Sequence, residues 1–163
     1  MPTLTTQPAP TWLRDLAQAR ATYEETLGWP VTIQVGRRDL VVPVAGPLAA
    51  IGMPAPLGAA VRQALTIALL PAPIVADPTA TWWTFLTRPV ISLRIDVAHD
   101  LAALRVRIFP RNTPIELPLS LTTSTPTTRH WVEPPTPTHP LPPGSAVIAM
   151  VRRLTHHDGH LAA

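Results

Sequence analysis

The chain has 163 residues, the length of one domain, and 46% of them are hydrophobic, so it can bury a core and is not a disordered chain. All thirteen cations are arginine and the formal charge is only +3, which excludes a strong overall positive field as a reason to expect nucleic-acid binding. The absence of cysteine excludes disulfides, thiolate nucleophiles and cysteine-ligated zinc.

Membrane and export signals are missing from the sequence. No stretch reaches the roughly 18 consecutive apolar residues of a membrane span, and the first ten residues lack the basic start and apolar core of a secretion signal. We therefore expect a cytoplasmic protein without a membrane partner. Residues 1–10 are expected to form a flexible lead, 11–155 a single domain, and 156–163 a flexible tail that contains histidines.

The first half of the chain predicts a helix, a hairpin and a second helix. Apolar residues recur at helical spacing over 11–27, and Gly28 is suited to end that helix. Alternating apolar and polar residues at 31–35, the turn "GRRD" and the returning apolar stretch 40–44 predict a β-hairpin. The glycines and prolines of 45–56 predict an irregular loop. Apolar residues at four-residue spacing then predict a buried helix over 57–70.

The second half predicts short strands and a closing helix. Strands are expected at 74–76, 82–87 and 90–95. "VAHDLAALRV" predicts a short helix, and "RVRIFP" followed by "NTPIELPLS" predicts a second hairpin. The proline-rich stretch 126–143 should cross the surface, with "RHWVE" as an edge strand. A final helix is expected to be capped by Ser145 and to run through residue 154.

Two adjacent tryptophans, Trp82 and Trp83, stand within one of the predicted strands. Neighbouring side chains of a strand point to opposite faces, so the two rings cannot enter the same core layer. In one interpretation helices cover both faces, or a proline-rich loop covers one ring. In the other, the outward ring stacks on a nucleotide base.

Five arginines lie near these tryptophans in the sequence: Arg88, Arg94, Arg105, Arg107 and Arg111. Arg105 and Arg107 would share one face of a strand, where they could contact phosphates. Solvated faces also carry such arginines, and nearby Asp96, Asp100 and Glu116 would neutralise them. Nucleic-acid binding through the two tryptophans and five arginines is therefore one hypothesis beside an ordinary polar surface.

The segment "DVAHD" offers two carboxylates with one helical turn between them. Asp96 and Asp100, with His99 adjacent, could hold a divalent metal or act as acid and base. The alternative is a polar helix start with Asp96 as the cap. The C-terminal histidines leave a similar choice, between a transition-metal site and a flexible tail: His156, His157 and His160.

The stretch "PPTPTHPLPP" matches the PxxP spacing that aromatic-lined domains bind in the polyproline conformation. Prolines also stiffen connections without any partner. A protein-interaction module that uses residues 126–143 is therefore a second hypothesis.

Two longer stretches carry a family resemblance: "RATYEETLGWPV" at 20–31 and "PAPIVADPTATWW" at 71–83. With "WTFLTRP", "IELPLS", "RHWVEPP" and "LPPGSAVIAMVRRL", they resemble the N-terminal primase-polymerase domain of bifunctional DNA primase/polymerases, within the archaeo-eukaryotic primase group and especially its short actinobacterial members. The resemblance implies an α/β (α+β) fold with an RRM-like mixed or antiparallel sheet and flanking helices.

The same resemblance implies a degenerate active site. Catalytic members hold divalent metal with a hydrophobic-Asp-hydrophobic-Asp motif, and in "SLRIDVAHD" Asp96 fills the first acidic position while Ala98 stands at the second. We expect a domain that binds nucleic acid, or a replication or repair protein, rather than a polymerase. The enzymatic alternative keeps Mg or Mn at Asp77 and Asp96, with His99 and Asp100 beside them, as a nucleotidyltransferase site. If the protein is not an enzyme, no cofactor is expected.

Overall fold

The computed structural model describes residues 8–122 and 128–158. In this part of the chain, four helices and two antiparallel sheets form a mixed α+β fold. The helices are α1 (Thr11–Leu27), α2 (Ala55–Ile67), α3 (Ile95–Ala103) and α4 (Gly144–Asp158). The strands are β1 (Thr32–Gln34), β2 (Asp39–Pro43), β3 (Ala49–Pro54), β4 (Ile74–Ala76), β5 (Trp82–Thr87), β6 (Arg107–Ile108), β7 (Pro114–Leu117) and β8 (His130–Glu133).

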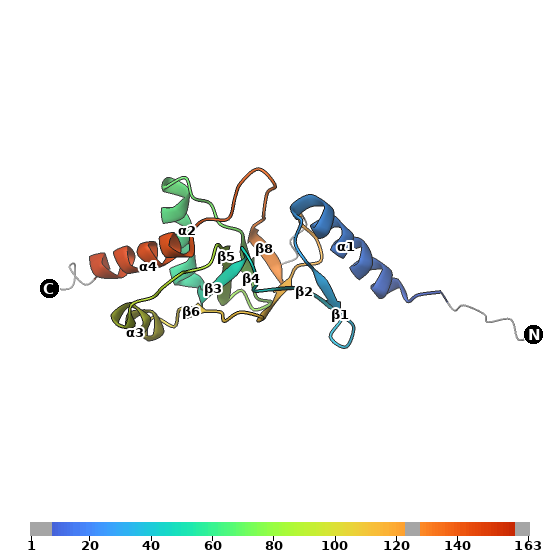
Figure 1. Cartoon of the computed structure of the whole chain (residues 1–163), viewed down its shortest axis with the longest axis horizontal. Helices are drawn as coiled ribbons and strands as arrows, with labels where there is room; N and C mark the ends of the chain where they lie inside the picture. The colour runs from blue at the N-terminus through green and yellow to red at the C-terminus, as the bar shows by residue number, and fades with distance from the viewer. Residues whose placement is uncertain (1–7, 123–127, 159–163) are drawn as a thin grey trace, which may run out of the picture.

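The smaller sheet has the strand order β1-β2-β7, and the larger has the order β6-β3-β5-β4-β8. Helix α1 and the β1–β2 hairpin lie toward one end of the molecule, whereas α3 and α4 lie toward the other (Figure 1). In the larger sheet, β5 is paired on both sides, to β3 and to β4. The described helices include none that is both long and apolar enough to cross a membrane.

The two faces of the larger sheet belong to two different cores. Alternate residues of β3 and β5 show this, because Ile51 and Phe85 lie in one cluster whereas Ala50 and Leu86 lie in the other. The first cluster is completed by residues of α2, α3 and α4: Val61, Leu65, Val97, Leu101, Val147 and Val151. The second is completed by residues of α1 and the smaller sheet: Leu16, Tyr23, Leu40, Val42, Ile115 and Leu117. The larger sheet is therefore covered by three helices on one face and, in part, by the smaller sheet on the other.

An aromatic cluster joins α1 to the sheets. Tyr23 lies 6.4 Å from Trp29 and 6.4 Å from Trp131 between ring centroids. The buried Tyr23 hydroxyl donates a hydrogen bond to the Pro118 carbonyl at 2.7 Å and accepts one from the Trp131 indole at 3.0 Å. Because both polar groups are satisfied, the cluster can be buried without the cost of an unpaired donor.

Most of the predicted elements are confirmed. Helix α1 ends where expected, at Gly28, whose left-handed φ of 67° a glycine adopts without strain. The β1–β2 hairpin, helix α2, strands β4 and β5, the short helix α3 and edge strand β8 are also present. Helix α4 is longer than predicted and begins at Gly144, so Ser145 lies inside its first turn rather than at its cap.

The predicted loop at 45–56 is wrong, because it contains the interior strand β3. This strand is buried on both faces from Ala49 to Met53, so it lacks the alternation of apolar and polar residues that identifies a half-exposed strand. Its glycine and terminal proline are also typical of loops. The composition of β3 therefore indicated a loop, although the structure has a strand there.

Two other predictions are corrected. The predicted strand at 90–95 is an unpaired segment that leads into α3, and the Ile91 side chain in it is fully exposed. The predicted second hairpin is also wrong, because β6 pairs with β3 whereas β7 pairs with β2 in the other sheet. Local sequence indicated extended backbone in both places, but it did not determine the strand partners.

Candidate functional site

The two adjacent tryptophans occupy different environments on the two faces of β5. Trp83 packs against α2, where a Cβ placed on Gly58 would come within 2.9 Å of its ring. Trp82 lies on the opposite face, over Gly52 of β3, where an added Cβ would lie 2.7 Å from the indole Nε1. The expected division between faces is confirmed: Trp83 packs against the helix-covered core, Trp82 lies on the other face, and both residues are partly exposed.

The exposed part of Trp82 lines an open hollow of about 600 Å³. The other lining residues come from the end of α3 and from β6: Ala102, Arg105, Val106 and Arg107. Both arginines are exposed, and neither guanidinium has a hydrogen bond or ion pair with any described residue. The hollow therefore combines an aromatic ring with two unneutralised cations.

The turn after α3 brings these arginines to the hollow. The Val106 amide donates to the Leu101 carbonyl at 2.8 Å, and Arg105 takes a left-handed φ of 60°, so the chain reverses at the end of the helix. Arg107 then pairs with Gly52 across β6 and β3. The prediction that the two arginines share a strand face is wrong, because Arg105 lies in this turn, yet the turn places both beside Trp82.

The remaining predicted arginines do not line this hollow. Arg88 donates a side-chain hydrogen bond to the Leu141 carbonyl at 3.2 Å, and Arg94 pairs with Asp96 at 3.1 Å. Arg111 is exposed in the turn before β7. Of the predicted tryptophans and arginines, the structure thus brings together Trp82, Arg105 and Arg107.

The predicted metal and acid-base residues are not assembled into a cluster. The described residues include no group of three histidine, aspartate or glutamate side chains that could hold a metal ion. Asp96 lies in the first turn of α3, two residues after the N-cap Arg94, so the polar helix start is present but the prediction that Asp96 is the cap is wrong. His99 and Asp100 are exposed on the same helix. His156 and His157 belong to the last turn of α4, and His160 lies outside the described residues.

Asp77 has a structural position in the turn between β4 and β5. Its carboxylate accepts hydrogen bonds from the Thr79 hydroxyl and from the amides of Thr81 and Trp82, the last two at 2.9 Å each. Desolvation raises the pKa of Asp77, but these hydrogen bonds and the charge of Arg129 outweigh it and hold that pKa below its usual range. The carboxylate therefore fixes the start of the strand that carries Trp82.

The proline-rich segment is attached to the domain. After β8 the chain turns at residues 137–138, where the His139 amide donates to the Thr136 carbonyl at 3.3 Å. The Arg88 amide donates to the Pro142 carbonyl at 2.8 Å, and Pro142 is buried. A continuous polyproline helix is therefore interrupted within the PxxP stretch.

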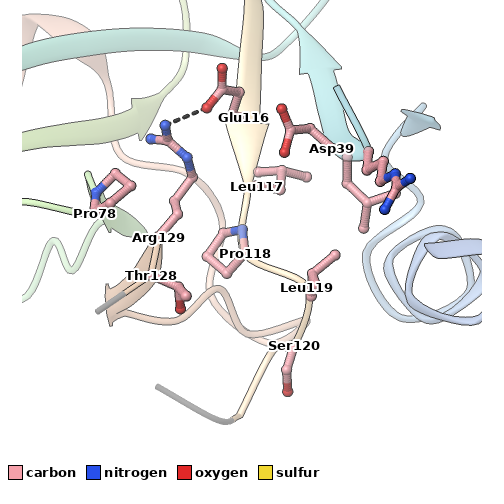
Figure 2. A pocket seen from close by; sticks show the side chains of 11 residues that line it. Asp39, Pro78, Glu116, Leu117, Pro118, Leu119, Ser120, Thr128 and Arg129 are labelled. Carbon is pink, nitrogen blue, oxygen red and sulfur yellow. Dashed lines mark hydrogen bonds and ion pairs between the residues drawn. The ribbon is translucent and has the colours of Figure 1, made fainter. Parts of the chain in front are cut away.

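A second hollow, of about 540 Å³, lies where β2, β7 and the start of β8 meet. Figure 2 shows the Arg129 side chain directed at the Glu116 carboxylate, with which it forms an ion pair. Glu116 also accepts a hydrogen bond from Arg37 at 3.4 Å. Glu116 therefore neutralises these two arginines rather than those of the first hollow. Sequence reasoning missed this arrangement, which depends on residues far apart in the chain.

Comparison with known proteins gives no further assignment. No protein-family model, curated protein or solved structure matches the chain. The resemblance to primase-polymerase domains therefore stays a prediction, and the function has to be argued from the geometry of the first hollow.

Proposed function

We propose that this protein binds nucleic acid through the hollow formed by Trp82, Arg105 and Arg107. The observation that carries the proposal is that a partly exposed indole and two guanidinium groups, neither of them paired with a described residue, line the same hollow. Aromatic rings stack on bases and arginines contact phosphates, so the three side chains match the two chemical parts of a nucleotide.

The positions and partners of the acidic residues favour binding over nucleotidyl transfer. Asp77 is engaged in a turn, and Asp96 is paired with Arg94. Two-metal transfer requires carboxylates that converge on both ions, and the candidate carboxylates do not converge in the described structure. The protein acts as a non-catalytic binding domain in a process such as replication or repair.

The finer fold assignment is part of the same proposal. An antiparallel sheet with helices on one face and a partly exposed aromatic ring on the other is the arrangement by which RRM-like modules bind nucleic acid. Three helices on one face of the larger sheet and Trp82 on the other support an RRM-like, primase-polymerase-like interpretation. Because a fold does not define an activity, the proposal depends on the hollow and not on this likeness.

Fluorescence anisotropy with a labelled partial duplex, measured at low and high salt, tests the proposal. The protein should bind, and added salt should weaken binding because phosphate contacts release counterions. The double variant Arg105→Ala/Arg107→Ala should lose most of the affinity. A matched double variant, Arg14→Ala/Arg20→Ala, removes the same charge from α1, at the other end of the molecule from α3, and should bind like the wild type (Figure 1). Absence of salt-sensitive binding at micromolar protein would refute the proposal.

A further inference from the structure

The hollow beside Trp82 has no side-chain hydrogen-bond acceptor among its lining residues. Indole and guanidinium groups only donate, and the remaining lining residues, Ala102 and Val106, are apolar. We infer that the protein binds unpaired single strands and does not distinguish their base sequence. This inference rests on the proposed function and specifies which nucleic acids the hollow accepts.

The requirement for an unpaired strand follows from the position of the ring. Trp82 is on the interior strand β5, and its side chain lies against Gly52 of β3 and lines the hollow. A ring in this position offers a ligand a stacking surface. In a duplex, neighbouring base pairs cover both faces of each base, whereas an unpaired strand leaves base faces free to stack on aromatic side chains.

Gly52 leaves the space that the Trp82 ring occupies. A Cβ on this residue would lie 2.7 Å from the indole Nε1 and 3.0 Å from the Phe109 ring, so any larger residue would displace one of the two rings. The Trp82 backbone amide is fixed as well, because it donates to Asp77. The strand that carries the ring is therefore anchored at the point where Trp82 enters the hollow.

The lack of sequence preference follows from the division of roles between the arginines and the indole ring. Discrimination among bases requires donors and acceptors that match the pattern on each base edge. An arginine directed at a base edge would select guanine, but the two arginines of the hollow are the groups suited to the phosphates, which leaves the indole alone to meet the bases. Every base has a face that can stack, so stacking adds affinity without selecting a sequence.

Competition anisotropy with a labelled oligo-dT strand tests the inference. The unlabelled competitors are oligo-dT, oligo-dC and oligo-dA, a duplex, and an abasic strand, all of one length. The three homopolymers should compete within about 5-fold of one another, because stacking tolerates every base. The duplex and the abasic strand should each compete at least about 5-fold more weakly, since a stacked base contributes roughly 5- to 150-fold in affinity.

Two variants locate the effect at the hollow. Trp82→Leu should bind base-containing and abasic strands alike, whereas Trp82→Phe, which keeps a ring, should retain part of the distinction. The abasic competition with the wild-type protein needs no variant, so it remains decisive even if Trp82→Leu does not fold.

The outcomes separate this inference from the proposed function. Equal competition by duplex and single strands, equal competition by abasic and base-containing strands, or a preference above about 30-fold for one homopolymer would overturn the inference while leaving nucleic-acid binding intact. Absence of any binding would overturn both. Wild-type affinity and wild-type selectivity in Trp82→Leu would place the binding surface elsewhere and also overturn both.

Discussion

Replacement of Arg105 by glycine should stabilise the protein and weaken its binding of nucleic acid. Arg105 has a φ of 60° in the turn after α3, a conformation that costs an L-amino acid roughly 1 to 2 kcal/mol and costs glycine little. Glycine is also the preferred residue after a helix end. We therefore expect Arg105→Gly to raise the free energy of unfolding by about 1 kcal/mol, which is about 2 to 4 °C in melting temperature for a chain of this size.

The loss of binding can be calculated separately. Each phosphate contact with a single strand contributes about −0.7 to the slope of log affinity against log salt concentration. Removal of the Arg105 guanidinium should make the slope of the variant shallower by about 0.7. Urea denaturation measures the stability, and an anisotropy titration at several salt concentrations measures the slope.

Two controls separate the effects. Ala80 also has a left-handed φ, of 55°, and lies in the turn before β5, so Ala80→Gly should stabilise the protein and leave the salt slope unchanged. Arg105→Ala keeps a Cβ, so it should flatten the slope without the gain in stability. An unchanged slope in both Arg105 variants would refute the phosphate contact, and a gain in stability for Ala80→Gly but not for Arg105→Gly would refute the argument from strain.

Four further substitutions test contacts at the hollow and elsewhere in the fold. Gly52→Ala should displace Trp82 and reduce both binding and stability. Gly58→Ala places a Cβ 2.9 Å from Trp83, so it should lower stability by about 1 to 3 kcal/mol and leave the affinity of the folded protein unchanged in anisotropy. The pKa of Asp77 is lower in the folded state than in the unfolded state. The ionised carboxylate therefore stabilises the fold fully above about pH 4, and this stabilisation is lost as the pH falls through the folded pKa. Asp77→Asn should make the free energy of unfolding, measured by urea denaturation, fall less steeply at acid pH. Tyr23→Phe removes a hydroxyl with two buried hydrogen bonds and should cost about 1 to 3 kcal/mol in urea denaturation, with unchanged anisotropy.

The elements that sequence predicted well are those whose pattern is local. Helix α1 has an amphipathic period and a glycine stop, and the β1–β2 hairpin has a polar turn. Strand β3 lacked such a signal because both of its faces are buried. In residues 90–95 the β-branched residues indicated extended backbone, but strand pairing also needs a neighbour, which only tertiary structure supplies.

The candidate site was predictable in part for the same reason. Side-chain alternation separated Trp82 from Trp83, but which of them would face helices depends on the packing of distant segments. The sequence did not predict that Arg105 lies beside Trp82. That position depends on a left-handed conformation, which residues other than glycine seldom adopt. The sequence did not show that Gly52 has to be a glycine, because that requirement comes from the Trp82 ring that lies over it.

The position of β5 between two paired neighbours makes Trp82 part of the cooperative unit of the fold. A ring carried by a surface loop can be lost through local fraying, but this strand leaves the sheet only if the ladders to both β3 and β4 separate. The molecule should therefore keep its ligand-binding capacity intact until it melts, and on heating the two losses should coincide at a single temperature.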